Sequence, residues 1–327
     1  MKYNRIHYLV TLALLTMVFF CNSCEKDEDE NGDDTPQQES YRIEEEVKSE
    51  DSQNVSKETY EYSGEKISKV MIYDYNGKDL WEEDQKDEYS YPDAATVVIT
   101  NFEMVSGEWE ENDKEEIRFA NGVWSEHITY NHDGVEWNPS TKTAYTYQGS
   151  QLVGMIDYDY VGGMEIAVYK IDFTWNGDKV QDATSYNYQE NDWKKVTKDT
   201  IYYQDGTTIE KIETWSFDAQ EVVQRVVFAY QGGKLESMTT YIVDFMGNWN
   251  QVFKNSYEYD EHGNLSKHTN FTDYLGTTKT FVSRYSYDKG SGNFRQIWGQ
   301  NSGWFSWYPT PAKNLPEKEF FQNKFQY

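Results

Sequence analysis

Cysteine, proline and positive charge are all scarce in this sequence, and each scarcity excludes a class of protein. The 327 residues include two Cys and six Pro, which excludes disulfide-framework, collagen-like and proline-rich chains. Basic residues number 30 against 57 acidic ones, for a formal net charge of -27. A surface so acidic repels a phosphate backbone, so we do not expect a nucleic-acid partner.

Aromatic side chains are abundant. They make up 17% of the residues, with 28 Tyr, 16 Phe and 11 Trp, although hydrophobic residues in total reach only 37%. Disordered chains are poor in aromatic residues, so most of this chain is expected to fold. Its length corresponds to two domains on the usual prior, but a single all-β barrel or sandwich can also be this long.

The N-terminus has the pattern of an export signal. Lys2 and Arg5 precede an apolar run over residues 8–21, which has signal-peptide length and is short for a membrane span. The run breaks at Asn22-Ser23-Cys24, and the segment resembles a bacterial lipoprotein signal, in which the Cys after a small residue is lipidated. The resemblance implies a signal peptide over residues 1–23 and membrane attachment only through a lipid on Cys24. An ordinary secretory signal is the alternative.

An acidic segment follows Cys24. Residues 25–30 read Glu-Lys-Asp-Glu-Asp-Glu, and they resemble the Lys-then-acidic export signal that sends Bacteroidetes lipoproteins to the outside of the outer membrane. The resemblance implies a surface-exposed outer-membrane lipoprotein. Like charges also hold a linker extended by self-repulsion, so residues 24–40 are expected to form a flexible acidic tether.

The body of the chain is a repeat. Two apolar, mostly aromatic residues separated by one residue recur nine times, and successive first members lie 27 to 29 residues apart. A fixed period of this length indicates a repeat architecture. The doublets are Tyr60/Tyr62, Tyr89/Tyr91, Ile117/Phe119, Tyr145/Tyr147, Phe173/Trp175, Ile201/Tyr203, Phe228/Tyr230, Tyr257/Tyr259 and Tyr285/Tyr287.

Turn signals divide each repeat into two strands. After most doublets, a turn dipeptide precedes an aliphatic residue, as Asn176-Gly177 precedes Val180, and such dipeptides supply the positive φ of tight hairpins. A second turn lies about half a period later, as at Asn76-Gly77. Each repeat is therefore predicted to be a hairpin with strands of about ten residues.

These features predict an all-β fold class. Over residues 41–295 we expect a long antiparallel meander of about 16 to 18 strands, built from nine 28-residue hairpin repeats. Open sheets rarely exceed about ten strands, so the meander is expected to be curled or closed into a soluble barrel-like shell. A closed barrel of this width would leave a lumen that side chains cannot fill.

Strict alternation along the strands predicts which side chains share a face. It places each doublet, the aliphatic residue after the turn and the alternate residues that follow on one side of the sheet. That side would hold all the aromatic bands together with a charged waist made of Lys69, Asp182, Lys211, Glu213 and Lys267. A charge at mid-depth of a lipid-facing band costs about 2 to 4 kcal/mol. These charges argue against a membrane-spanning barrel.

The turn-punctuated doublets and the run YEYDEHGNL at residues 257–265 resemble Bacteroidetes surface lipoproteins of unknown function with a porin-like antiparallel β-meander. The same run resembles, more weakly, the tyrosine-aspartate repeats of Rhs-type shells, whose period is closer to 20 residues. The resemblance implies a fold and a location, and no activity.

Signatures of catalysis are absent from the sequence. It contains no GxSxG, no P-loop, no HExxH and no GxGxxG in a βαβ context, and acidic residues are too numerous for any close carboxylate pair to be informative. The histidines outside the signal are expected as solvated turn and strand residues: His127, His132, His262 and His268. We therefore expect no enzymatic activity, no catalytic residues, no cofactor and no metal site.

The C-terminal segment, residues 296–327, breaks the period and is expected to be an aromatic cap on the last edge of the same domain. Its irregular aromatic residues are the first choice for stacking on a ligand: Trp298, Trp304, Trp307 and Tyr308. Another group recurs at multiples of 28 residues near the second turns and is expected to serve packing: Trp81, Trp109, Trp137, Trp193 and Trp249.

The sequence thus predicts a lipid-anchored cell-surface β-repeat protein that acts as a binding or structural module. A glycan or another surface protein is the expected partner. The alternatives are a glycan-binding protein and, second, a carbohydrate-active enzyme. A glycan binder should show an open aromatic cleft, a scaffold should bury its aromatic residues, and an enzyme should show two convergent carboxylates with a raised pKa.

Overall fold

The computed structural model describes residues 40–290, apart from 79, 122, 150, 205–207 and 275–276. Within this range the chain forms eighteen β-strands joined by short turns. The strands are β1 (Tyr41–Glu50), β2 (Gln53–Ser63), β3 (Lys66–Tyr75), β4 (Trp81–Asp93), β5 (Thr96–Val105), β6 (Glu108–Ala120), β7 (Val123–His132), β8 (Trp137–Gln148), β9 (Gln151–Val161), β10 (Met164–Asn176), β11 (Lys179–Gln189), β12 (Asp192–Gln204), β13 (Thr208–Ser216), β14 (Glu221–Gln231), β15 (Lys234–Val243), β16 (Trp249–Tyr259), β17 (Leu265–Tyr274) and β18 (Thr277–Lys289).

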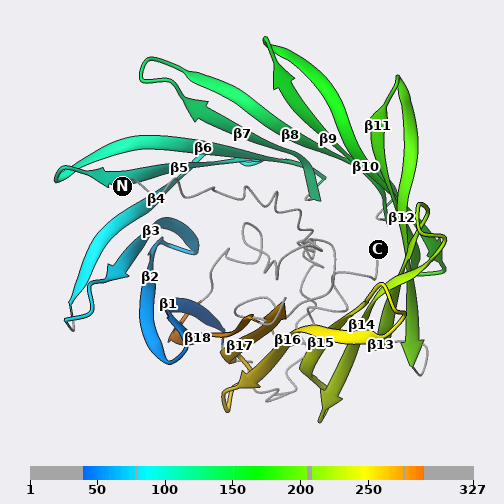
Figure 1. The fold of residues 1–327 in the computed structure, drawn as a ribbon. Coiled ribbons are helices and arrows are strands. Elements are labelled where there is room, and N and C mark those ends of the chain that lie inside the picture. The colour runs from blue at the N-terminus through cyan, green and yellow to red at the C-terminus, as the bar shows by residue number, and fades with distance from the viewer. Residues whose placement is uncertain are drawn as a thin grey trace, which may run out of the picture.

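The strands form one closed antiparallel barrel. Each strand pairs with the next along the chain, and β1 also pairs with β18, from Tyr41 opposite Lys289 to Glu50 opposite Phe281. Figure 1 shows the strands following one another round a ring in chain order. Strands about 4.8 Å apart and tilted by about 40° close eighteen strands into a ring about 36 Å across. The predicted meander of hairpin repeats is confirmed, and its two end strands meet.

Two kinds of turn join the strands, one at each end of the barrel. The first turns follow the doublets and are tight, as at Gly177, whose φ is 64°, and at Gly232, whose φ is 61°. Only a residue without a Cβ adopts this backbone region at no cost. The second turns, such as the one between β15 and β16, lie at the opposite end.

A β-bulge after most of the first turns changes the expected faces. Glu61 pairs with Lys69 while Tyr62 pairs with Ile67, so Ser68 is an extra residue. One extra residue moves every later side chain to the other face. Equivalent shifts occur in the other hairpins, for example between Thr174 and Trp175.

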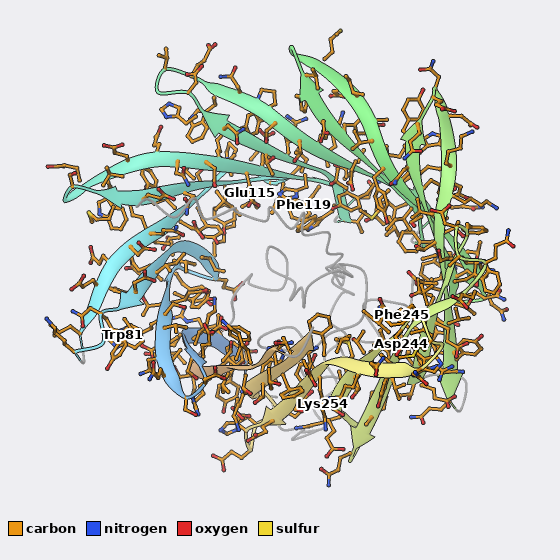
Figure 2. All side chains as sticks on the ribbon, in the orientation of Figure 1. Trp81, Glu115, Phe119, Asp244, Phe245 and Lys254 are labelled. Atoms are coloured by element: carbon orange, nitrogen blue, oxygen red, sulfur yellow. The ribbon has the colours of Figure 1, made fainter. Side chains whose placement is uncertain are left out.

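The prediction that all aromatic side chains share one face is therefore wrong. The doublets and the aliphatic residue after each turn face the inside of the barrel, as Figure 2 shows for Phe119. The aromatic residues before the second turns face outward, and Figure 2 shows Trp81 on the outer side. The charged residues expected on the doublet face also lie on the outer wall, because each follows a bulge: Lys69, Asp182, Lys211, Glu213 and Lys267.

Candidate functional site

The predicted lipidation and ligand-stacking residues lie outside the described residues. These are Cys24 and the four C-terminal residues Trp298, Trp304, Trp307 and Tyr308. The same holds for the expected signal peptide and C-terminal cap. All remain predictions, and the candidate surfaces of the described barrel are its inner wall, its outer wall and its two rims.

The inner wall near the first turns is an apolar tier. The first doublet members are buried, for example Tyr60, Phe173 and Tyr257. They pack with the aliphatic residues after the first turns, of which Ile67 and Leu235 have no exposed surface. Aromatic rings that are enclosed in this way are used in packing and are closed to a ligand.

The second doublet members tie neighbouring repeats together. The Tyr203 hydroxyl donates a hydrogen bond to the Val180 carbonyl at 2.8 Å, and the Trp175 ring N–H donates to the Leu152 carbonyl at the same distance. Each acceptor belongs to the aliphatic residue of the preceding repeat. The same bond is made by Tyr62 to Ile43, Tyr91 to Ile67, Tyr259 to Leu235 and Tyr287 to Leu265.

Below the apolar tier, the inner wall holds buried carboxyl groups. Burial raises the pKa of Asp87 and of Asp199 to about 7 in each case. Each carboxyl accepts one hydrogen bond from the next strand: Asp87 accepts from the Asn101 amide at 2.9 Å, and Asp199 accepts from the Thr214 hydroxyl. A single neutral donor does not replace the water that a carboxylate loses on burial, so the protonated form is favoured.

A second polar group lies on β6 to β9. His127 Nε2 is 2.9 Å from Glu115 Oε2, and the Thr143 hydroxyl donates to Asp157 at 2.7 Å. Burial alone would raise the pKa of Glu115, but the hydrogen bond and charge of His127 outweigh it and lower that pKa. Burial raises the pKa of Asp157. Figure 2 shows Glu115 on the inner side of the ring.

The expectation that His127 is solvated is wrong, because its side chain is only 4% exposed. Its ring lies 5.8 Å from that of Trp124, which is also buried. His127 stands directly across from Ile117 in the neighbouring doublet. That register was the signal in the sequence that could have placed it inside the barrel.

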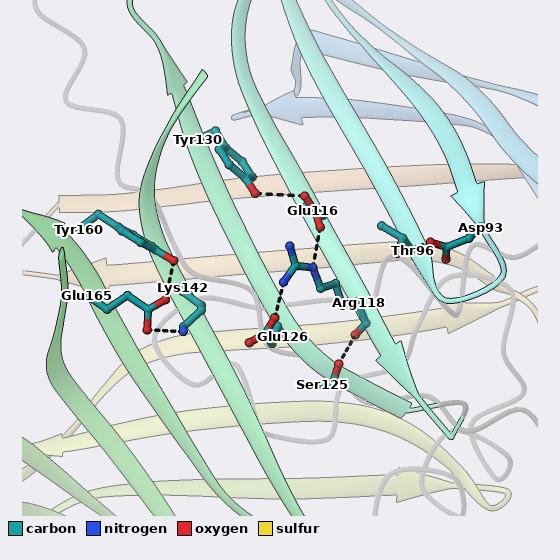
Figure 3. Close-up of polar contacts among 10 residues, drawn as sticks. All are labelled: Asp93, Thr96, Glu116, Arg118, Ser125, Glu126, Tyr130, Lys142, Tyr160 and Glu165. Carbon is teal, nitrogen blue, oxygen red and sulfur yellow. Dashed lines mark hydrogen bonds and ion pairs between the residues drawn. The ribbon is translucent and has the colours of Figure 1, made fainter. Parts of the chain in front are cut away.

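The outer wall carries ion pairs. The Arg118 guanidinium lies 2.6 Å from Glu116 and 2.7 Å from Glu126, and the Tyr130 hydroxyl donates to Glu116 at 3.1 Å (Figure 3). Other outward ion pairs join Lys69 to Glu61, Lys198 to Asp182, Lys211 to Glu213 and Lys267 to Glu258. Charged side chains therefore line this part of the outer wall, whereas a band that faces lipid tails is apolar.

A belt of cations on aromatic rings runs round the outer wall near the second turns. Lys114 Nζ lies 4.1 Å from the centre of the Tyr130 ring and 5.1 Å from that of Trp137. The contact recurs in other repeats, with Lys57, Lys86, Lys142 and Lys170 over one or two rings each and with Arg225 over Trp249. We call these residues the Lys-aromatic belt. The five lysines recur 28 or 29 residues apart, a signal that the sequence analysis missed.

The described residues contain no group of three or more His, Cys, Asp or Glu side chains that could hold a metal ion. In the described part of the chain, no helix is long and apolar enough to cross a membrane.

Comparison with known proteins gives similarity at the level of solved structures. No family model and no curated protein matches the chain. A protein of unknown function from Bacteroides fragilis has 19% identity over 34% of this chain and 86% of its own, with a TM-score of 0.30. A porin-like protein from Bacteroides vulgatus has 8% identity over 75% of this chain and 98% of its own, with a TM-score of 0.33.

A weaker likeness extends to the TcdB2-TccC3 structure, which has 8% identity over 72% of this chain and 20% of its own, with a TM-score of 0.23. The resemblance to porin-like Bacteroides proteins, with a weaker one to Rhs-type shells, is thus present at the structural level. Likenesses of this size carry no argument about function.

Proposed function

We propose that the chain is a lipid-anchored protein of the bacterial outer surface that acts as a structural or binding shell. One observation carries the proposal: the repeated aromatic residues are used to build the barrel. The first doublet members are buried, and second members such as Tyr203 hydrogen-bond the preceding repeat. A residue that recurs in nearly every repeat meets a packing need, whereas a single binding site needs it once.

The outer wall supports attachment through a lipid rather than by insertion. Ion pairs such as Lys211–Glu213, near the middle of β13, lie on the wall that a membrane barrel would expose to lipid tails, where one charge at mid-depth costs about 2 to 4 kcal/mol. The lipoprotein-like signal that ends at Cys24 provides an attachment point at the end of an acidic tether.

Metabolic labelling with an alkyne fatty acid tests the anchor. We expect the wild-type chain and Cys21→Ala to incorporate the label, and Cys24→Ala to lose it and leave the membrane fraction. Protease added to intact cells should degrade the wild-type domain if it faces outward. Loss of label in Cys21→Ala but not in Cys24→Ala would contradict the assignment.

An enzymatic role finds little support in the buried carboxyl groups. Asp87 on β4 and Asp199 on β12 both have raised pKa values, but they lie eight strands apart in the barrel. Glycoside hydrolysis needs two carboxyl groups within about 10 Å of each other. Each of these groups is hydrogen-bonded to its own neighbouring strand, so we propose that they serve the wall.

Glycan binding is the second candidate, and the outer aromatic residues favour it. Trp215 is 40% exposed, Trp249 37% and Tyr188 38%, so each presents ring surface on which a sugar could stack. Titration with a panel of polysaccharides, followed by Trp fluorescence, tests this role. We expect Trp215→Ala and Trp249→Ala to weaken the response, and no response to any glycan removes the candidate.

A further inference from the structure

The exposed apolar side chains gather at one end of the barrel. The large hydrophobic residues that are exposed at the second turns or at the strand ends next to them include Leu80, Val105, Val135, Val161, Met164, Phe245 and Met246. Val135 is 89% exposed and Phe245 is 96% exposed. Among the described first turns, none exposes a large hydrophobic side chain. We call the second-turn end the apolar rim.

Two turns at the ends of β16 show that the fold does not require these apolar tips. The turns Asp244–Asn248 and Asp260–Asn264 share one architecture, in which the Asp carboxyl accepts hydrogen bonds from two backbone N–H groups and from the Asn side chain. Their backbones close with the same pair of hydrogen bonds.

The tips of these two turns differ in chemistry. At the apolar rim the two residues after the Asp are Phe245 and Met246, whereas at the other rim they are Glu261 and His262. The same scaffold therefore presents an apolar tip at one end and a polar tip at the other. Asp133 supports Val135 in a related way, by accepting from the Val135 and Glu136 N–H groups at 2.9 Å.

The Lys-aromatic belt lies directly behind the apolar rim. Trp81, Trp137 and Trp249 are the first residues of β4, β8 and β16. Trp and Lys side chains with an apolar body and a polar end are the residues that settle at the headgroup level of a bilayer. A ring of single apolar tips backed by such residues matches the layering of a membrane interface.

We propose that the apolar rim docks on the interface of a lipid bilayer, with its tips among the headgroups. The tips are separate points, about 10 Å apart where adjacent repeats carry them, which suits a fluid plane better than a shaped protein partner. The proposal uses the lipid anchor only to bring the domain to a membrane. Fifteen residues separate Cys24 from Ser40 at the other rim, and this length of chain reaches up to about 55 Å against a barrel height of about 33 Å.

Charge predicts which lipid the rim prefers. Carboxylates stand beside the tips, including Glu108, Asp133 and Glu136, and the whole chain has a net charge of -27. An anionic surface would repel them over about one Debye length. We therefore expect binding to zwitterionic vesicles, weakened when anionic lipid is added at low salt.

Vesicle co-sedimentation tests the proposal on the full mature chain carrying Cys24→Ser, which has no lipid of its own. We expect this chain to pellet with phosphatidylcholine vesicles. The double variant Phe245→Glu, Met246→His should have a vesicle affinity at least about tenfold lower, because burial of two such apolar side chains raises the affinity by more than a factor of ten. Glu261→Ala at the matching turn is the control and should bind as the parent does.

Two outcomes would overturn the proposal. The first is that the Cys24→Ser chain ignores phosphatidylcholine vesicles, or that the double variant binds as tightly as the parent. The second is that light scattering without vesicles shows a dimer that the double variant abolishes, which would assign the rim to a second copy of the chain. Neither result depends on lipidation at Cys24, so both are separate from failure of the labelling experiment.

Discussion

At the residue scale, the inner wall contains acids whose burial works against stability near neutral pH. Asp87 and Asp199 are 9% and 5% exposed, and each has a pKa raised to about 7. An acid whose pKa is higher in the folded state than its unfolded value of about 3.9 leaves the free energy of unfolding unchanged at a pH below 3.9. As the pH rises further, the free energy of unfolding falls, and the loss is complete above about pH 7.

The substitution Asp87→Asn should therefore stabilise the barrel in a pH-dependent way. The amide oxygen can still accept the bond from Asn101, while the charge is gone. We expect a gain of a few kcal/mol at pH 8, since each pKa unit corresponds to about 1.4 kcal/mol, and none at pH 4. Urea denaturation of variant and wild type at both pH values measures it.

The matched variant is Asp133→Asn on the exposed rim. Backbone hydrogen bonds from Glu136 and Val135 lower the pKa of Asp133, so its ionised form contributes stability that is present at pH 8 and lost as the pH falls. This variant should lose stability at pH 8. Equal effects of the two substitutions at pH 8 would contradict the assignment of burial as the cause at Asp87.

These residue-scale features could not be predicted from the sequence. Asp87 is one of 57 acidic residues; its position two residues before Tyr89 places it on the doublet face, but does not show that its carboxyl is buried there. Its burial depends on the register with β5, which places it opposite Asn101. By contrast, the doublets were predictable because a period of 28 residues is visible without any knowledge of register.

At the element scale, a side-chain hydrogen bond that crosses the repeat boundary joins most hairpins to the preceding one. Tyr203 provides it for Val180 at 2.8 Å. We expect Tyr203→Phe to lower the free energy of unfolding by about 1 kcal/mol, because the ring still packs while the buried carbonyl loses its donor.

The control for this bond is Tyr188→Phe. Tyr188 is 38% exposed on the outer wall, so removal of its hydroxyl should change the free energy of unfolding by less than about 0.5 kcal/mol. Guanidinium titrations of both variants decide the point. Equal losses would mean that the Tyr203 hydroxyl does not join the repeats.

The strands and turns were predictable, but the faces were not. Asn-Gly and Gly-Gly dipeptides fix a tight turn by their local backbone needs, and these turns are where the sequence places them. The bulge residue Ser68 has no such local signature. It is visible only when two strands are aligned, so the sequence alone placed Lys69 on the wrong face.

At the scale of the whole molecule, closure is the feature that the repeat could not decide. Nine hairpins of one kind can form an open curled sheet or a barrel in which the first and last strands pair. The contacts between neighbouring hairpins are the same in both arrangements. The meeting of β1 with β18 depends on the accumulated twist and tilt of all eighteen strands. Closure leaves no edge strand free to pair with another chain.

A cross-link at the seam tests closure directly. Ser49 on β1 stands opposite Val282 on β18, and Cα atoms of directly opposite residues lie about 4.5 to 5.5 Å apart, which suits a disulfide. In a chain that begins at residue 25, both natural cysteines are absent. The double variant Ser49→Cys, Val282→Cys should form one disulfide on oxidation and raise the denaturant midpoint, since the bond closes a loop of more than 200 residues.

The control pair is Ser49→Cys, Thr200→Cys, which lies on β1 and the distant β12 and should stay reduced. Failure of the first pair to oxidise, measured by thiol titration and mass, would mean that the two end strands lie apart and the barrel is open.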